Sequence, residues 1–284
     1  QGYAYEQMAI LFRTNLGIRF VMDALMKGGI PFHMKDAIPN LFAHWISLDI
    51  IAYLRLVSGT GNTRANWLRI MNRPNRYIKR EALAPFTSDI SVAQLKAYYQ
   101  DKDWMLERLD RLEYDLSIMK RMSPYAAIHY LSNAMKYQDY LKDYAKEHHI
   151  NEQELLDVLN AVHESSQSCR TFAEWFTYID TYTEELQKQA KSPASKDANN
   201  ESGVCLCTLH CAKGLEYPIV FIPDINEDNI PHARAAVDAD LEEERRLFYV
   251  GITRAKEHLH LYCVGEASGK EKFPSRFLEE LNEM

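Results

Sequence analysis

Strand-like segments at both ends of the chain bracket a long helical stretch, and this order constrains the fold more than any other feature. Near the start, the apolar run Gln7–Phe12 predicts a buried strand, and Ile30–Met34 predicts a second one. Between them, apolar residues at helical spacing predict a helix that stops at Gly28 and Gly29. A strand–helix–strand unit is typical of a parallel α/β layer.

The same pattern returns near the end of the chain. Val204–Leu209, Pro218–Ile225 and His258–Val264 predict strands, and Asp240–Lys256 predicts a helix between the last two. We therefore expect the two outer pieces to form one α/β domain with a parallel sheet, from which the helical middle emerges.

The middle of the chain has a helical period from about Trp45 to Leu186. The helices are expected to break at residues 123–126, 148–151 and 166–171, and residues 188–203 are expected to form a flexible surface loop. An apolar stripe marks the last helix: Phe172, Trp175, Phe176, Ile179 and Leu186. The domains are predicted as 1–107 and 201–284 for the α/β domain and 108–200 for the helical insertion with its return loop.

The composition limits the class of protein. No apolar run approaches the roughly 18 residues of a membrane span, and the first residues lack the pattern of a signal peptide. Five cysteines in a chain of 284 residues favour a reducing, cytoplasmic compartment. Because the chain begins almost inside a strand-like run, we expect it to be part of a longer protein.

The net charge of −7 argues mildly against a free-standing nucleic-acid binder, but the charge is unevenly spread. Between Arg55 and Arg80 the chain has seven basic residues and no acidic one. Such a cluster can neutralise phosphates, and Arg69, Arg73 and Arg76 are its candidate DNA contacts. A solvated helical face whose acidic partners lie elsewhere in the fold is the equal alternative.

A cysteine and histidine cluster raises the question of a metal site. Cys205, Cys207, His210 and Cys211 fall within seven residues, and zinc sites use both residue types. However, Cys205 and Cys207 alternate along an apolar strand and would both face the core, where free cysteines are common. No C-x₂-C pair occurs in the sequence, so we expect no metal site.

Two further positions have simple explanations when taken alone. Lys213 and Gly214 follow a predicted strand, where α/β sheets bind ligands, but such a turn is common. Arg246 and Arg254 are eight residues apart, which would place them on nearly the same face of the predicted helix. Arg254 could simply interact with the helix dipole, whereas an arginine at a domain edge can also contact a transferring phosphoryl group.

Three longer segments make a resemblance specific. "TLHCAKGLEYPIVFI" and "EEERRLFYVGITRAKEHLHLY" closely resemble the fifth and sixth helicase motifs of the UvrD/PcrA/Rep family of superfamily 1 DNA helicases, and "AILFRTNLGIRFVMDALMKGGIPF" resembles the fourth. They occur in the order of the family, and the helical middle lies where the family has an insertion. The resemblance implies that the α/β pieces are the second RecA-like domain, 2A, and that the helical middle is its 2B insertion.

The resemblance also implies roles for individual residues. Phe12 would stack on the base of ATP, and Arg13 and Arg254 would reach the γ-phosphate, where two cations stabilise transition-state charge. Glu216 would lie near the ribose and phosphates. Three residues would couple the nucleotide state to the DNA strand: Thr208, His210 and Lys213.

Some family features are absent. The sequence contains no G-x-x-x-x-G-K-[ST] loop, and Ser58–Arg64 has its glycines without the Lys-Ser/Thr pair. ATP and Mg²⁺ would therefore be held mainly by an N-terminal RecA-like domain upstream. Asp228 stands where the family commonly has glycine, which leaves the shape of that loop open.

These observations predict the C-terminal part of an ATP-dependent 3′-to-5′ DNA helicase, inactive as an isolated piece. Its partners would be single-stranded or duplex DNA, the N-terminal RecA-like domain and, through the helical insertion, a protein. The alternative is a non-catalytic DNA- or protein-binding module on a helicase-like scaffold. A phosphate-binding loop upstream would favour the helicase, and its absence would favour the module.

Overall fold

A computed structural model of the chain describes residues 2–35, 39–61, 63–191, 202–233, 235, 238–267 and 270–282. The chain divides into two compact units. Unit 1 comprises Gln1–Pro39 and Leu186–Met284, and unit 2 comprises Asn40–Glu185. The predicted flexible loop lies largely outside the described residues, because 192–201 are not among them.

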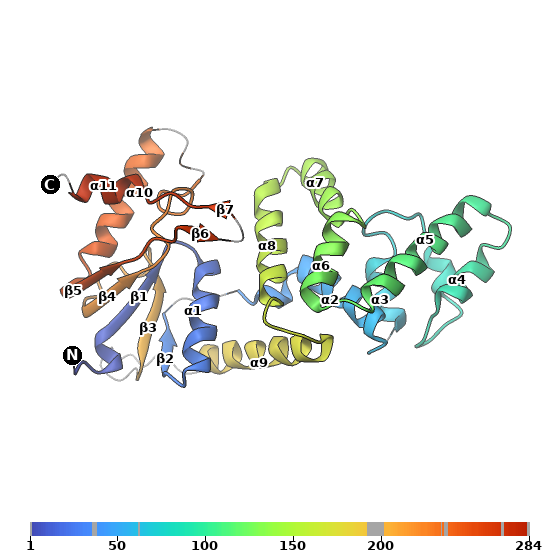
Figure 1. The fold of residues 1–284 in the computed structure, drawn as a ribbon, viewed down its shortest axis with the longest axis horizontal. Coiled ribbons are helices and arrows are strands. Elements are labelled where there is room, and N and C mark those ends of the chain that lie inside the picture. The colour runs from blue at the N-terminus through green and yellow to red at the C-terminus, as the bar shows by residue number, and fades with distance from the viewer. Residues whose placement is uncertain are drawn as a thin grey trace. The chain divides into compact units, whose positions relative to one another are not determined.

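Unit 1 is built on a five-stranded parallel sheet with the strand order β2-β3-β1-β4-β5 (Figure 1). The first two strands in the chain, β1 and β2, come from its start, and the other three come from its end. The bounds are Met8–Phe12 for β1, Phe32–Met34 for β2, Val204–Thr208 for β3, Tyr217–Ile222 for β4 and Ala255–Leu261 for β5. The prediction of an α/β fold with a parallel sheet interrupted by helices is therefore confirmed.

Helices pack against this sheet. The first, α1 (Asn15–Lys27), contacts β1 and β3. Two later helices, α10 (Asp238–Ile252) and α11 (Arg276–Asn282), contribute Leu247, Phe248 and Phe277 to a core shared with alternate residues of the strands. Cys205 and Cys207 lie in this core with no exposed surface, as predicted. A short hairpin, β6 (Glu266–Ala267) and β7 (Lys270–Glu271), precedes α11.

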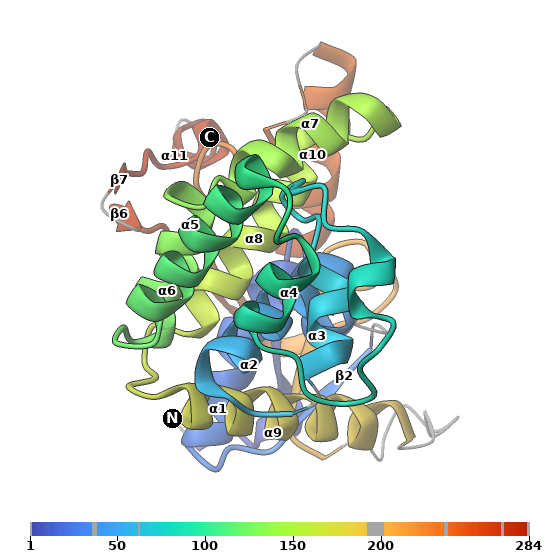
Figure 2. The ribbon, with the colours of Figure 1, turned by 90° about the vertical axis from the view of Figure 1, so that its right-hand side faces the viewer.

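Unit 2 is helical, and Figure 2 shows its helices from another side. Phe42 makes edge-on ring contacts with Trp175, Tyr178 and Tyr182 in its core. The predicted breaks are confirmed, because Ser123 and Asn151 cap new helices and a helix ends at Ser165. The bounds are Trp45–Ser58 (α2), Thr63–Ile70 (α3), Val92–Tyr98 (α4), Asp103–Met119 (α5), Pro124–Asn133 (α6), Tyr137–His148 (α7), Glu152–Ser165 (α8) and Phe172–Lys191 (α9).

The borders of the compact units differ from the predicted domain borders. The helical unit begins at residue 40, whereas the prediction placed residues 1–107 in the α/β domain. Residues 40–107 belong to the helical unit because α2 packs against α3, α5, α6 and α8. The helical unit also ends earlier, at residue 185 and not at 200.

One helix ends earlier than its sequence predicts. The helix expected over Asp240–Lys256 is α10, which ends at Ile252, and residues 255 and 256 already belong to β5. Arg254 therefore lies in the link between helix and strand, so the prediction that it shares a helix face with Arg246 was wrong. The strand β5 begins early because its amide and carbonyl groups pair with β4 from Tyr217 onward.

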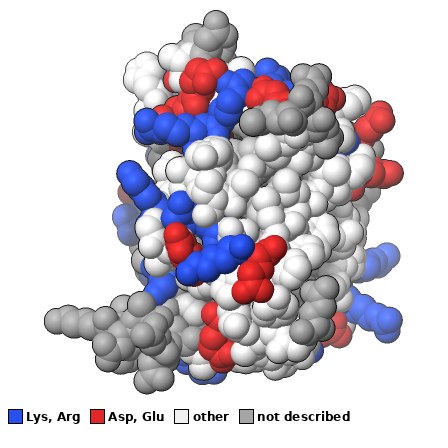
Figure 3. Space-filling view, turned by 90° about the vertical axis from the view of Figure 1, so that its left-hand side faces the viewer, with Lys and Arg blue, Asp and Glu red and all other residues white. Residues whose placement is uncertain are grey.

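The acidic excess does not form one patch on the side of unit 1 that Figure 3 shows. There, Lys and Arg side chains lie close to Asp and Glu side chains, and a broad area carries neither. Among the described helices, none is both long and apolar enough to cross a membrane.

Candidate nucleotide and DNA sites

A pocket of about 200 Å³ lies at the carboxyl end of β1, where parallel sheets bind ligands. It contains Phe12 and Arg13, the two residues predicted to contact ATP from the fourth motif. Phe12 is only 3% exposed, and a Cβ atom on Gly17 would lie 3.1 Å from its Cδ1 atom. Glycine at this position therefore lets the first turn of α1 approach the ring. The lining residues are Phe12, Arg13, Thr14, Gly17, Phe20, Pro223, Asp224 and Asn229.

Arg13 is held by a carboxylate of α10. Its Nε atom donates to Glu244 Oε2 at 2.8 Å, and its Nη2 atom lies 2.5 Å from Glu244 Oε1. Glu244 Oε2 also accepts the backbone N–H of His232 at 3.0 Å. Burial raises the pKa of Glu244, but the hydrogen bonds from Arg13 and His232 outweigh it, so the pKa lies below its usual value. Glu244 is thus ionised at neutral pH.

Glu216 and Arg254 lie at the amino ends of β4 and β5, opposite the carboxyl end of β1 where Arg13 lies. They directly precede β4 and β5, whereas Arg13 directly follows β1 in the same parallel sheet. Arg254 donates from Nε to the Val250 carbonyl at 2.9 Å and from Nη1 to the Leu215 carbonyl at 3.0 Å. Glu216 forms an exposed ion pair with Lys256 at 3.0 Å. Arg254 therefore contacts the last turn of α10 and the loop before β4.

In the fifth-motif loop between β3 and β4, buried apolar residues alternate with polar residues that are exposed to solvent. Leu209 and Ala212 have no exposed surface, whereas His210 and Lys213 are exposed and Thr208 is partly exposed. A Cβ atom on Gly251 of α10 would lie 2.4 Å from Leu209 Cδ2, so only glycine allows the helix to pack this closely on the loop. The three predicted DNA-coupling residues thus lie on one fixed loop.

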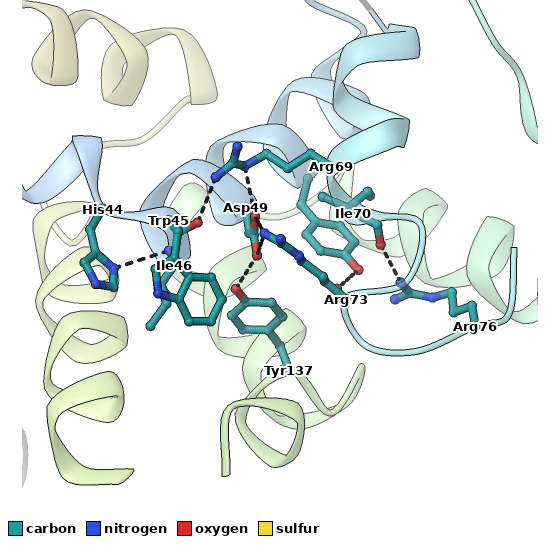
Figure 4. A network of polar contacts seen from close by, with 10 residues as sticks. His44, Trp45, Ile46, Asp49, Arg69, Ile70, Arg73, Arg76 and Tyr137 are labelled. Carbon is teal, nitrogen blue, oxygen red and sulfur yellow. Dashed lines mark hydrogen bonds and ion pairs between the residues drawn. The ribbon is translucent and has the colours of Figure 1, made fainter. Parts of the chain in front are cut away.

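In unit 2, the predicted DNA contacts form part of a polar network around Asp49, whose side chain has no exposed surface (Figure 4). Arg69 Nε and Arg73 Nη1 each lie 2.9 Å from Asp49 Oδ1, and the Tyr137 hydroxyl donates to Oδ2 at 2.9 Å. Burial raises the pKa of Asp49, and the Arg73 and Arg69 guanidinium groups and the Tyr137 hydroxyl oppose that rise. One carboxylate therefore offsets part of the positive charge of two arginines.

Arg76 differs from these two arginines. Its Nη1 atom donates to the carbonyl oxygens of Ile70 and Pro74, at 3.1 and 3.2 Å, so its charge is not offset by a carboxylate there. Beside the network, a groove of about 510 Å³ is lined by Arg69, Arg73 and Tyr140 together with Ala65, Leu68, Met71 and Asn72. Arg69 and Arg73 thus pair with the buried Asp49 and remain partly exposed to solvent.

Several residues of these sites could not be recognised from the sequence. Glu244 and Arg13 are 231 positions apart, and Asp224 and Asn229 reach the pocket from a loop after β4. The sequence signal for this loop was Asp228, which stands where the family commonly has glycine. In the structure Asp228 has φ 70° and Asp224 has φ 54°. Both are left-handed conformations that glycine adopts without strain. No group of three or more potential metal ligands is present among the described residues.

Comparisons with known proteins agree with the motifs. The family model for the UvrD-like helicase C-terminal domain matches residues 1–265. The chain is 30% identical to a putative ATP-dependent DNA helicase, YjcD, of Bacillus subtilis, over 99% of the chain and 37% of that protein. It is 30% identical to the ATP-dependent DNA helicase PcrA of Bacillus subtilis, over 90% of the chain and 36% of that protein. It is 29% identical to the ATP-dependent DNA helicase PcrA of Staphylococcus epidermidis, over 99% of the chain and 40% of that protein. The chain thus spans about two fifths of the length of these relatives.

Proposed function

Because the chain belongs to the family of UvrD-like helicase C-terminal domains, we propose that it is the C-terminal part of an ATP-dependent DNA helicase that moves 3′-to-5′ on single-stranded DNA. Unit 1 is the second RecA-like domain, 2A, and unit 2 is its 2B insertion. The match of the family model over residues 1–265 carries this proposal. The five cysteines, an odd number in a chain of 284 residues, support a reducing, cytoplasmic location.

In this proposal, unit 1 supplies one wall of the ATP cleft. Glu216 contributes a carboxylate near the ribose and phosphates. Phe12, predicted to stack on the base, is only 3% exposed and lies at the opposite end of the strands, so its ring has little surface to offer a base. An N-terminal RecA-like domain of the same protein holds Mg²⁺ and the triphosphate, since this sequence has no P-loop. Motion follows from closure of the two domains on ATP and reopening after hydrolysis.

Arg254 supplies positive charge to the γ-phosphate, at the end of the strands that also carries Glu216. It must first exchange the Leu215 carbonyl for the phosphate. Its charge then stabilises the oxygens of the phosphoryl group in the transition state. Arg13 lies at the opposite end of the parallel strands, in an ion pair with Glu244, so the two arginines do not lie beside one phosphate in this structure.

The DNA strand follows the fifth-motif loop, where Thr208, His210 and Lys213 lie beside the nucleotide-binding wall. Arg69, Arg73 and Arg76 of unit 2 add contacts to DNA phosphates. A non-catalytic binding module on the same scaffold is the alternative, favoured by the groove beside Arg69 and Arg73. A P-loop in the upstream sequence distinguishes the two, because only the motor requires it.

The role of Arg254 is tested in the complete protein. The Arg254→Ala variant is expected to lower DNA-stimulated ATP hydrolysis by roughly 10³-fold or more, by analogy with arginine fingers. Arg246→Ala is the matched control, because Arg246 is an exposed α10 arginine whose carboxylate partner among the described residues is Glu243, at 3.0 Å. An unchanged rate in Arg254→Ala would remove this residue from the site.

A further inference from the structure

One face of the unit 1 sheet has helices over only part of its width. Ala9 and Leu11 of β1 share a core with α10 and α11, whereas Phe12 faces α1, since a Cβ atom on Gly17 would lie 3.1 Å from its ring. The helix α1 contacts β1 and β3. The main contacts of β4 and β5 are with each other, with β1, with the short 3₁₀ helix η1 (Tyr5–Gln7) and with α10 on the opposite face. On the α1 face, these two strands therefore have no extensive contact with a described α-helix.

The side chains on this part of the sheet include no lysine, arginine, aspartate or glutamate. The register places them in two rows across β1, β4 and β5, and Tyr262 follows at the end of β5: Met8, Ile219 and His258; Ile10, Phe221 and His260. We call these seven residues the open face. The rings of Phe221 and His260 stack with centroids 4.8 Å apart, and Tyr262 is 51% exposed. Seen from the side on which β5 lies in Figure 1, unit 1 shows a broad area without charged side chains (Figure 3).

The open face has the size and chemistry to bind one amphipathic helix. Parallel sheets are normally covered by helices on both faces. The strand β5 has seven residues, a length of roughly 23 Å, which a helix of about 15 residues would span. Such a helix, about 10 Å wide, covers two neighbouring strands. Its apolar stripe would pack on the uncharged rings, and its polar side would face water.

The first residues of the chain lie beside the open face. The Tyr3 ring meets His258 edge-on with centroids 5.7 Å apart, and its hydroxyl donates to Glu257 Oε2 of β5 at 2.6 Å. A segment that precedes Tyr3 in a longer protein would reach the open face within a few residues. A segment that follows α11 would start on the opposite face, because Phe277 of α11 stacks on Phe248 of α10. The position of Tyr3 therefore favours an upstream segment.

The direction of the connections in the sheet leads to the same face. The connection through α1 runs from β1 toward β2, and the connection through α10 runs from β4 toward β5, in opposite directions along the strand order. Right-handed connections therefore place the two helices on opposite faces, as observed. A helix that joined a further strand at the β5 edge to β1 would follow the direction of the α1 connection. It would therefore pack on the α1 face, over β4 and β5.

We propose that the open face is the docking surface for an amphipathic helix from the segment directly upstream of Gln1 in the complete protein. This inference rests on the proposed function, because it takes the chain to be part of a longer helicase, as its relatives are. The helix would complete the cover of the second RecA-like domain. Its sequence should have apolar residues at positions i, i+3, i+4 and i+7.

The test is hydroxyl-radical footprinting of the complete protein, with oxidation of single tyrosines measured by mass spectrometry. Tyr262 of the open face is compared with the matched control Tyr114 of α5, which is 60% exposed. Oxidation of Tyr262 should be largely lost in the complete protein, whereas Tyr114 should be oxidised. In the isolated chain both rings should be oxidised. Tyr53, which has no exposed surface, reports the folding of each sample.

A chain extended upstream by about 30 residues, enough for the helix and its links, identifies the occupant. Loss of Tyr262 oxidation in this extended chain would support the helix. Equal oxidation of Tyr262 and Tyr114 in the complete protein would overturn the proposal. Loss in the complete protein but not in the extended chain would assign the open face to another domain, and loss in the isolated chain that increases with concentration would assign it to a second copy. Either result would also overturn the helix.

The footprint and the proposed function fail in different measurements. Absence of DNA-stimulated ATP hydrolysis by the complete protein would overturn the proposed function. The oxidation of Tyr262 does not depend on hydrolysis, so it decides the occupant of the open face in either case.

Discussion

At the scale of single residues, the most informative contact is the ion pair between Arg13 and Glu244. Arg13 lies in the fourth motif and Glu244 in the sixth, and their side chains are only 17% and 10% exposed. The pair therefore fixes α10 to the end of β1. It also gives the Arg13 guanidinium group a carboxylate partner within the chain.

Replacing Glu244 by glutamine should lower the free energy of unfolding of the chain by about 1–3 kcal/mol at pH 7, because Arg13 loses a charged acceptor. The folded-state pKa of Glu244 is below its unfolded value. Its stabilising contribution is therefore present above about pH 4.3 and is lost as the pH falls through the folded pKa. Urea unfolding of the chain and the variant at pH 7 and about pH 3.5 measures this difference.

The difference in unfolding free energy between the unaltered chain and Glu244→Gln should be smaller at the lower pH. Glu243→Gln serves as the control, since Glu243 forms only an exposed pair with Arg246 and its loss should change stability little. An unfolding free energy of Glu244→Gln equal to that of the unaltered chain at pH 7 would show that the pair has no stabilising role.

Residue-level predictions from the sequence succeeded where local pattern decides the environment. Alternation along an apolar strand was enough to place Cys205 and Cys207 in the core. The same reasoning gave no partner for Arg13, because Glu244 is brought to it only by the packing of α10. The nucleotide and DNA roles of the motif residues stay predictions.

At the scale of elements, sequence periodicity predicted which segments are helices and strands better than where they end. The helix before β5 was expected to continue to Lys256, but pairing of β5 with β4 ends it at Ile252. Likewise, the predicted border at residue 107 placed α2 and α3 in the α/β domain. Packing of α2 against α3, α5, α6 and α8, which no local pattern reveals, places both helices in unit 2.

The contacts within unit 2 also decide which arginine substitution tests DNA binding without disturbing the fold. Neutralising Arg69 or Arg73 would leave Asp49 buried with one partner fewer, so stability and affinity would change together. Arg76 donates to two carbonyl groups, lies over the Tyr53 ring and forms no ion pair with a described carboxylate, so Arg76→Gln removes a charge without breaking an ion pair there. If it contacts a phosphate, its loss should reduce the salt dependence of log K for duplex DNA by about 0.9.

The measurement is DNA affinity between about 50 and 200 mM salt by fluorescence anisotropy. Lys120→Gln is the control, because Lys120 is an exposed cation at the end of α5, away from the groove-lining residues. A salt slope unchanged in Arg76→Gln would remove this residue from the DNA interface.

At the scale of the whole molecule, two compact units together carry the match to the UvrD-like helicase C-terminal domain. The order of α/β and helical segments in the sequence predicted both parts, because the sheet takes strands from both ends of the chain. The relatives that match are more than twice as long as this chain. In the proposed function, the triphosphate and Mg²⁺ are held by a domain outside it.

The central claim is that this chain completes an ATP site but does not form one alone. The most direct test is single-stranded DNA-stimulated ATP hydrolysis, measured for the isolated chain and for the complete protein at equal concentration with saturating Mg²⁺ and ATP. We predict turnover on the order of 1 per second or faster for the complete protein and none above background for the chain. DNA-stimulated turnover by the isolated chain would contradict this division of the site.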